Sequence, residues 1–177
     1  MTLITLTALL LGLQVAISDL TARRVSNRVL LAVLCVVLVA QLFGNGAAPS
    51  VADCLLGGVI GLAVLLPFHV IGWMGAGDVK LFSTIGFLLG AKALLPIWVC
   101  ASLAAGGHAF LVVAWPLAVR YLPIPLYRAS TAYHGNGWLQ DWQRNLRAAR
   151  QGRAGIPYAA YLGVAMIGYV LQRGGYV

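Results

Sequence analysis

Two aspartates stand out because acidic residues are nearly absent from this chain. The sequence has four aspartates and no glutamate. Asp78 lies in the stretch Gly75–Lys80, Gly-Ala-Gly-Asp-Val-Lys, directly before an apolar segment, and Asp19 lies at the end of the first apolar segment. An ionisable residue at the end of a membrane-length segment indicates a functional site. Two such carboxylates, if the fold brings them together, can share one proton and activate water by general acid–base catalysis.

The other two aspartates have structural explanations. Asp53 follows Ser50 with the spacing of a capping box, which opens a helix. Asp141 lies in the stretch 138–147, where apolar and basic residues separate onto opposite helical faces. Such a pattern is typical of an amphipathic helix at a membrane surface, where Asp141 can pair with Arg144. We therefore assign the chemistry to Asp19 and Asp78.

The composition predicts an all-α polytopic membrane protein. Hydrophobic residues make up 61% of the chain, charged residues 9%, and the mean hydropathy is +0.90. A soluble domain of this size does not need so much apolar surface, because its outside faces water. We expect a single membrane-embedded domain over residues 1–177 with about six transmembrane helices. The apolar segments lie at about 2–18, 29–43, 51–72, 79–91, 93–119 and 156–171, and the least certain division is at Gly90.

The positive charges predict how these segments are oriented. If all six cross the membrane, most basic residues share one side, and only Lys92 and Arg173 fall on the other. The crowded side is then cytoplasmic and the N-terminus lies outside. The cytoplasmic side includes a loop at about 120–154 that contains the amphipathic stretch. Asp19 and Asp78 return to the same cytoplasmic face, because the chain crosses twice between them. The net charge of +8 is a topology signal that also suits anionic lipids and gives no reason to invoke nucleic acid.

Three residues beside Asp78 form an expected active-site loop. Gly75 and Gly77 would allow a backbone shape, or a close approach by a peptide, that a side chain blocks. Lys80 either tunes the acidity of the carboxylates or anchors its helix at the head-group level, which we favour. The cysteines at 35, 54 and 100 stand singly in apolar runs, so we expect small packing residues, no disulfide and no metal site.

Three stretches resemble motifs of the prepilin peptidases, membrane aspartyl proteases of the GxGD type. Residues 19–27 resemble the family's first motif, an Asp followed by basic residues, with Ser26 at the usual Pro position. Gly75–Lys80 matches the second motif completely. Gly155–Ala160 is similar to the Pro-Tyr-Gly segment that opens the last helix, with Ala159 at the usual Gly position. In length and order of spans, the chain is most similar to the short branch that serves Flp-type, tight-adherence pili.

This resemblance implies an aspartic endopeptidase in which Asp19 and Asp78 are the catalytic pair. The implied substrate is a prepilin or pseudopilin precursor, whose basic leader is removed at the cytoplasmic face of the bacterial inner membrane without a cofactor. Longer family members carry a cysteine-bearing insertion after the first span and also methylate the new N-terminus. This chain has only a short loop there, Asp19–Arg28, so we expect peptidase activity alone, although methyl transfer could reside in the membrane part.

Two other functions remain open at this stage. A small proton- or cation-coupled transporter would also use membrane carboxylates, but it predicts polar residues through the membrane thickness, whereas these acids lie at one face. A catalytically inactive assembly factor of a secretion machine would differ from an enzyme only in lacking activity. The oligomeric state and the residues that bind the leader are not indicated by the sequence.

Overall fold

The computed structural model describes residues 2–43, 49–119 and 156–174, and the regular secondary structure of this part of the chain is all helical. The helices are α1 (Leu3–Ala22), α2 (Asn27–Phe43), α3 (Val51–Val70), α4 (Ala76–Leu89), α5 (Ala91–Val119) and α8 (Tyr158–Gly174). The all-α prediction is confirmed for these residues. The expected amphipathic helix at 138–147 and the loop at 120–154 lie outside them.

Three of the described helices are long and apolar enough to cross a membrane: Leu3–Ala22, Val51–Val70 and Ala91–Trp115. Asn27–Leu42 is apolar but shorter. Large apolar side chains such as Leu10, Val59 and Leu103 are exposed on the outside of the bundle. Such a surface suits lipid rather than water. The helices therefore form a membrane bundle whose core and outer face are both apolar.

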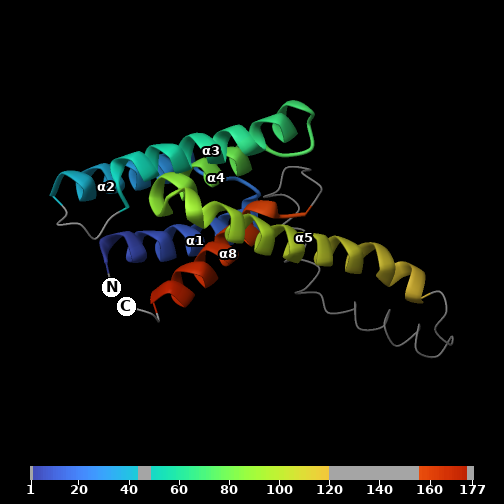
Figure 1. Cartoon of the computed structure of the whole chain (residues 1–177). Helices are drawn as coiled ribbons and strands as arrows, with labels where there is room; N and C mark the ends of the chain where they lie inside the picture. The colour runs from blue at the N-terminus through green and yellow to red at the C-terminus, as the bar shows by residue number, and fades with distance from the viewer. Residues whose placement is uncertain (1, 44–48, 120–155, 175–177) are drawn as a thin grey trace.

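The short helix α4 lies at the centre of the bundle. It contacts each of the other five described helices, and most extensively α3. Leu81, Phe82, Ile85 and Leu88 of α4 are almost completely buried. In Figure 1, α3 covers α4 on one side, α1 and α8 run side by side, and the second half of α5 projects beyond the bundle. The first turn of α4 is consequently held by several elements at once.

Close glycine contacts fix α3 against α4. A Cβ atom added at Gly57 would lie 2.1 Å from the carbonyl oxygen of Gly86, and one added at Gly86 would lie 2.2 Å from that of Gly57. One turn further along α3, an added Cβ at Gly61 would lie 2.9 Å from the carbonyl oxygen of Phe82. The backbones therefore touch directly, as small residues allow in membrane helix pairs. Gly12 and Gly163 make the corresponding approach between α1 and α8.

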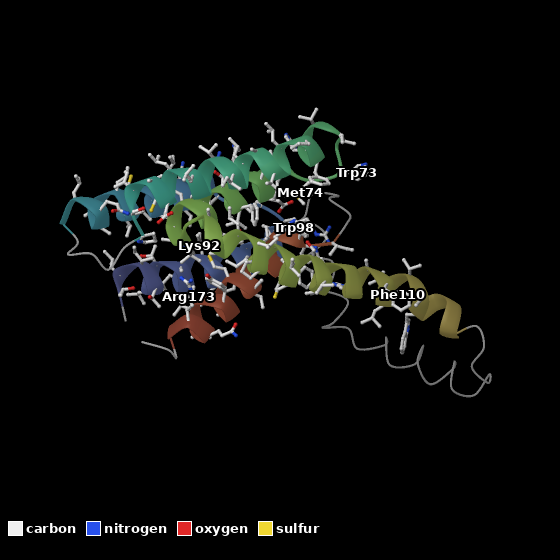
Figure 2. All side chains as sticks on the ribbon, in the orientation of Figure 1. Trp73, Met74, Lys92, Trp98, Phe110 and Arg173 are labelled. Atoms are coloured by element: carbon white, nitrogen blue, oxygen red, sulfur yellow. The ribbon has the colours of Figure 1, made fainter. Side chains whose placement is uncertain are left out.

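The turn between α4 and α5 occurs at Gly90, where the sequence left the division open. Gly90 has φ +82°, a conformation that residues with a Cβ atom rarely adopt, and its N–H donates to the carbonyl of Gly86 at 2.9 Å. Lys92 follows at the start of α5. In Figure 2, Lys92 and Arg173 lie toward the same end of the bundle, and Trp73 and Met74 lie toward the opposite end. Lys92 and Arg173 are the two basic residues that the topology predicted from the sequence places on the side opposite the other basic residues.

Two helix boundaries differ from the sequence prediction. α1 continues to Ala22, so Asp19 lies in its last turn, and Arg23 ends the helix with φ 50° while its N–H bonds the carbonyl of Asp19. α4 begins at Ala76, so Gly77 and Asp78 lie in its first turn. The polar residues at both boundaries had suggested shorter helices.

Candidate active site

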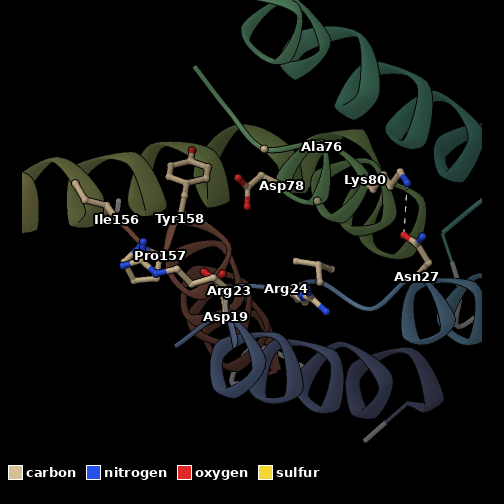
Figure 3. A pocket seen from close by; sticks show the side chains of 13 residues that line it. Asp19, Arg23, Arg24, Asn27, Ala76, Asp78, Lys80, Ile156, Pro157 and Tyr158 are labelled. Carbon is tan, nitrogen blue, oxygen red and sulfur yellow. Dashed lines mark hydrogen bonds between the residues drawn. The ribbon is translucent and has the colours of Figure 1, made fainter. Parts of the chain in front are cut away.

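One cavity of about 510 Å³ brings together the residues that the sequence singled out. It lies where the end of α1, the start of α2, the first turn of α4 and the start of α8 meet (Figure 3). Its lining is mostly polar or charged. The residues are Asp19, Arg23, Arg24, Val25, Asn27, Gly75, Ala76, Gly77, Asp78, Lys80, Ile156, Pro157 and Tyr158. Asp19 and Asp78 therefore face the same cavity, although 58 residues lie between them in the sequence.

Asp19 is a buried carboxylate with a backbone donor. Its side chain is 7% exposed, and Oδ2 accepts a hydrogen bond of 2.9 Å from the N–H of Ala160. Ala160 belongs to the first turn of α8, where backbone N–H groups have no partner within the helix. The contact thus satisfies both a buried acid and an otherwise unpaired donor, and it fixes the end of α1 against the start of α8.

Asp78 is half-buried and lies in the first turn of α4, ahead of the apolar part of that helix. In Figure 3, its carboxylate points away from α4 into the cavity shared with Asp19 and Tyr158. Burial and, to a smaller extent, the negative charge of Asp19 raise the pKa of Asp78, while a backbone hydrogen bond at Gly75 lowers it; together they bring the pKa to about 6. A carboxyl group with such a pKa can hold a proton near neutral pH and release it during a reaction.

The glycines of this motif do not form the loop that the sequence suggested. Gly75 is the N-cap of α4 with φ −70°, Gly77 lies within the helix, and neither has a positive φ. The unusual backbone conformation occurs earlier, at Gly72, with φ +84°. The expected backbone shape at Gly75 and Gly77 is therefore wrong. The glycines instead leave space, because a Cβ at Gly75 would lie 3.3 Å from Oδ2 of Asp78, while one at Gly77 would meet Val25 at an ordinary 3.5 Å.

Lys80 lines the cavity and reaches across to α2. Its Nζ donates to Oδ1 of Asn27 at 3.5 Å, a long hydrogen bond that joins the motif on α4 to the one after α1 (Figure 3). The side chain is exposed. A lysine beside a carboxylate would lower its pKa, and Lys80 is not among the causes that shift the pKa of Asp78. This geometry favours a positional role for Lys80 over tuning of the carboxylates.

Tyr158 is a cavity residue to which the sequence assigned no role. It begins α8 directly after Pro157, and its hydroxyl forms a 3.0 Å hydrogen bond with Oγ of Ser102 on α5. This bond holds the ring between α5 and the cavity. In the sequence, Pro157 is a signal for the start of a helix, because proline suits the first helical positions. The sequence alone does not indicate which helix ends face each other, so it could not place Tyr158 at the cavity.

A histidine braces the turn that leads into α4. Nδ1 of His69, near the end of α3, lies 3.0 Å from the carbonyl oxygen of Met74, directly before Gly75. His69 is exposed rather than packed in the core. It therefore orients the turn before Gly75 and is not a buried packing residue.

The remaining acids and the cysteines lie away from the cavity or outside the described residues. Asp53 is exposed, and its N–H donates to Oγ of Ser50 at 3.1 Å, which confirms the helix cap. Asp141 lies outside the part of the chain that the structure describes. Cys54 is buried, as expected for a small packing residue, whereas Cys35 and Cys100 are exposed. Within the described residues, no three His, Cys or Asp side chains are grouped closely enough to hold a metal ion.

The fold and the cavity together define a helical membrane protein with two carboxylates at one site. Comparison with protein families gives a match over residues 4–110 to the type IV leader peptidase family. The match covers more than half of the chain and includes Asp19 and Asp78. The chain belongs to this family of leader peptidases, which confirms the resemblance found in the sequence. Comparison with curated proteins and with solved structures found no match.

Proposed function

We propose that this protein is an aspartic endopeptidase that removes the basic leader from a prepilin or pseudopilin precursor, with Asp19 and Asp78 as the catalytic pair. The observation that carries the proposal is the position of both carboxylates on one cavity. Two neighbouring carboxyl groups in a partly dry site share a proton, so one activates water while the other polarises the scissile carbonyl. The family membership supports leader cleavage in general.

The substrate proposal follows from the surroundings of the cavity. The outer surface of the helices is apolar, so a precursor with a single apolar helix can lie beside them in the bilayer. The cavity itself has polar walls, which suit an unwound peptide segment between the leader and that helix. A precursor with a short basic leader and one apolar helix meets both conditions.

The experiment uses the full-length chain reconstituted in liposomes and a synthetic precursor with a basic leader followed by an apolar helix. Mass spectrometry is expected to find one cut, between the leader and the helix. A matched precursor that keeps the leader but has a polar soluble segment in place of the apolar helix should be cut far more slowly. If folded protein leaves every leader-bearing precursor intact, the assembly-factor alternative replaces the peptidase.

We also propose that the cavity faces the cytoplasm and that the chain crosses the membrane six times. The position of Lys92 and Arg173 toward the end of the bundle opposite Trp73 and Met74 supports this orientation. In a chain without native cysteines, Arg24→Cys is expected to react with impermeant thiol reagents only from the cytoplasmic side, and Lys92→Cys only from the outer side. Labelling of both positions from one side would contradict the orientation.

A further inference from the structure

The two carboxylates of the cavity have different surroundings. Oδ2 of Asp19 accepts the N–H of Ala160, a rigid backbone donor in the first turn of α8. The N-terminal end of a helix carries partial positive charge, so it stabilises a negative group placed against it. The oxygen that accepts this N–H cannot also carry a proton directed along the same line. Asp19 is thus held as an acceptor.

Asp78 is placed differently. It belongs to the first turn of its own helix, and its side chain points into the open part of the cavity. Burial and the charge of Asp19 outweigh the backbone hydrogen bond at Gly75, which raises the pKa of this carboxyl. A group that faces the cavity and keeps its proton can donate it to a carbonyl oxygen bound there.

We propose that Asp19 is the ionised carboxylate that takes a proton from the attacking water, and that Asp78 carries the proton that the pair shares before reaction. The first turn of α8, through the N–H of Ala160, is the positioning element that creates this difference. The inference rests on the proposed peptidase function and assigns a separate role to each member of the pair.

Burial alone would favour the opposite assignment, since Asp19 is the more buried of the two. A buried carboxyl without a donor prefers to be neutral, but a hydrogen bond to its charged form reverses this preference. Asp19 has such a bond, and its donor is backbone that cannot turn away. The ionisable side chains of the cavity come from α1 and the turn after it, α4 and α8: Asp19, Arg23, Arg24, Asp78, Lys80 and Tyr158. Among the described residues, α3 and α5 add no ionisable side chain to this lining.

The assignment gives a balanced hydrolysis. The water oxygen bonds to the scissile carbonyl carbon, a water proton moves to Asp19, and the proton of Asp78 moves to the carbonyl oxygen. The resulting diol collapses when the carbon–nitrogen bond breaks. Asp19 then gives its proton to the leaving amine, and Asp78 recovers a proton from a hydroxyl of the diol. Both carboxyl groups return to their starting states.

The low acid content of the chain allows a direct test. In full-length protein carrying Asp53→Asn and Asp141→Asn, the only side-chain carboxyl groups left are those of Asp19 and Asp78. Adding Asp78→Asn leaves Asp19 as the single side-chain carboxyl group, and adding Asp19→Asn instead leaves Asp78. Infrared spectroscopy of protein labelled with ¹³C-aspartate then measures the protonation of the remaining carboxyl group as a function of pH. The proton affinity of Asp78 alone is expected to exceed that of Asp19 alone by about tenfold or more. Equal affinities, or the reverse order, would overturn the assignment.

A second measurement tests the role of α8. Replacing residue Ala160 with lactic acid exchanges its N–H for an ester oxygen without changing the side chain. In the protein that retains Asp19 alone, this change is expected to increase the proton affinity of Asp19 by about three- to tenfold. The matched control is the same ester exchange at Leu162, which removes a bond internal to the helix and should leave the titration in place. If the ester at position 160 leaves the titration of Asp19 unchanged, the first turn of α8 does not create the difference between the two carboxyl groups. Both measurements work without substrate, so they are independent of whether the protein cleaves a leader.

Discussion

Asp78→Asn and Asp19→Asn are each expected to lower the rate of leader removal by about 10²- to 10⁴-fold, the range that general acid–base groups contribute. Asparagine keeps the size of aspartate but cannot exchange a proton in this reaction. In Asp19→Asn the amide oxygen can still accept the N–H of Ala160, so the contact between α1 and α8 should survive. The loss should therefore appear in turnover and not in the amount of folded protein. Rates of precursor cleavage in liposomes, normalised to inserted protein, measure it.

Asp53→Asn is the matched control for these two variants. It makes the same chemical change at an exposed helix cap, outside the cavity lining. Its Oγ partner, Ser50, remains to cap α3, so cleavage should stay near the wild-type rate. Retained cleavage by Asp78→Asn at a rate close to that of Asp53→Asn would reject the aspartic mechanism.

Gly86→Ala is expected to cause the largest loss of stability among single methyl additions to α4. The new Cβ would lie 2.2 Å from the carbonyl oxygen of Gly57, and a backbone atom cannot rotate away as a side chain can. The two helices must separate, which costs about 1–3 kcal/mol or more for an overpacked core. The midpoint of thermal unfolding in detergent should fall, and cleavage should fall with it because α4 carries Asp78.

Gly106→Ala provides the comparison within α5. An added Cβ there meets nothing within 4 Å, so the alanine should be neutral or should stabilise its helix by about 0.5–1 kcal/mol. Gly57→Ala tests the same contact as Gly86→Ala from the opposite side and should behave like it. Equal unfolding midpoints for Gly86→Ala and Gly106→Ala would mean that α3 and α4 do not pack as closely as described.

The sequence predicted the order of the described helices from signals that act locally. Apolar runs of membrane length, the glycine at position 90 and the cap formed by Ser50 each act within a few residues. Counting crossings predicted that Asp19 and Asp78 lie at the same face, but not that they meet, and in the structure both line one cavity. Polar residues at the ends of α1 and α4 concealed the true boundaries, because the tertiary contacts that extend these helices are distant in sequence.

The contacts of α8 could not be predicted in the same way. The N–H of Ala160 and the hydroxyl of Tyr158 meet partners on α1 and α5, far away in the chain. A backbone donor has no signature in the sequence, because every residue except proline carries one. Only the arrangement of the helices identifies which donor meets an acid.

The length of α4 has a consequence for how water reaches the site. A helix of 14 residues is about 21 Å long, whereas the hydrocarbon layer of a bilayer is about 30 Å thick. With Gly90 at one surface of the membrane, Ala76, the first residue of α4, would lie about 9 Å short of the other surface. The cavity of about 510 Å³ at this end of α4 is then large enough to hold several water molecules. A helix shorter than the hydrocarbon layer thus leaves room for water beside its first turn, and adding one turn to α4 would move Asp78 toward the surface and make this space shallower.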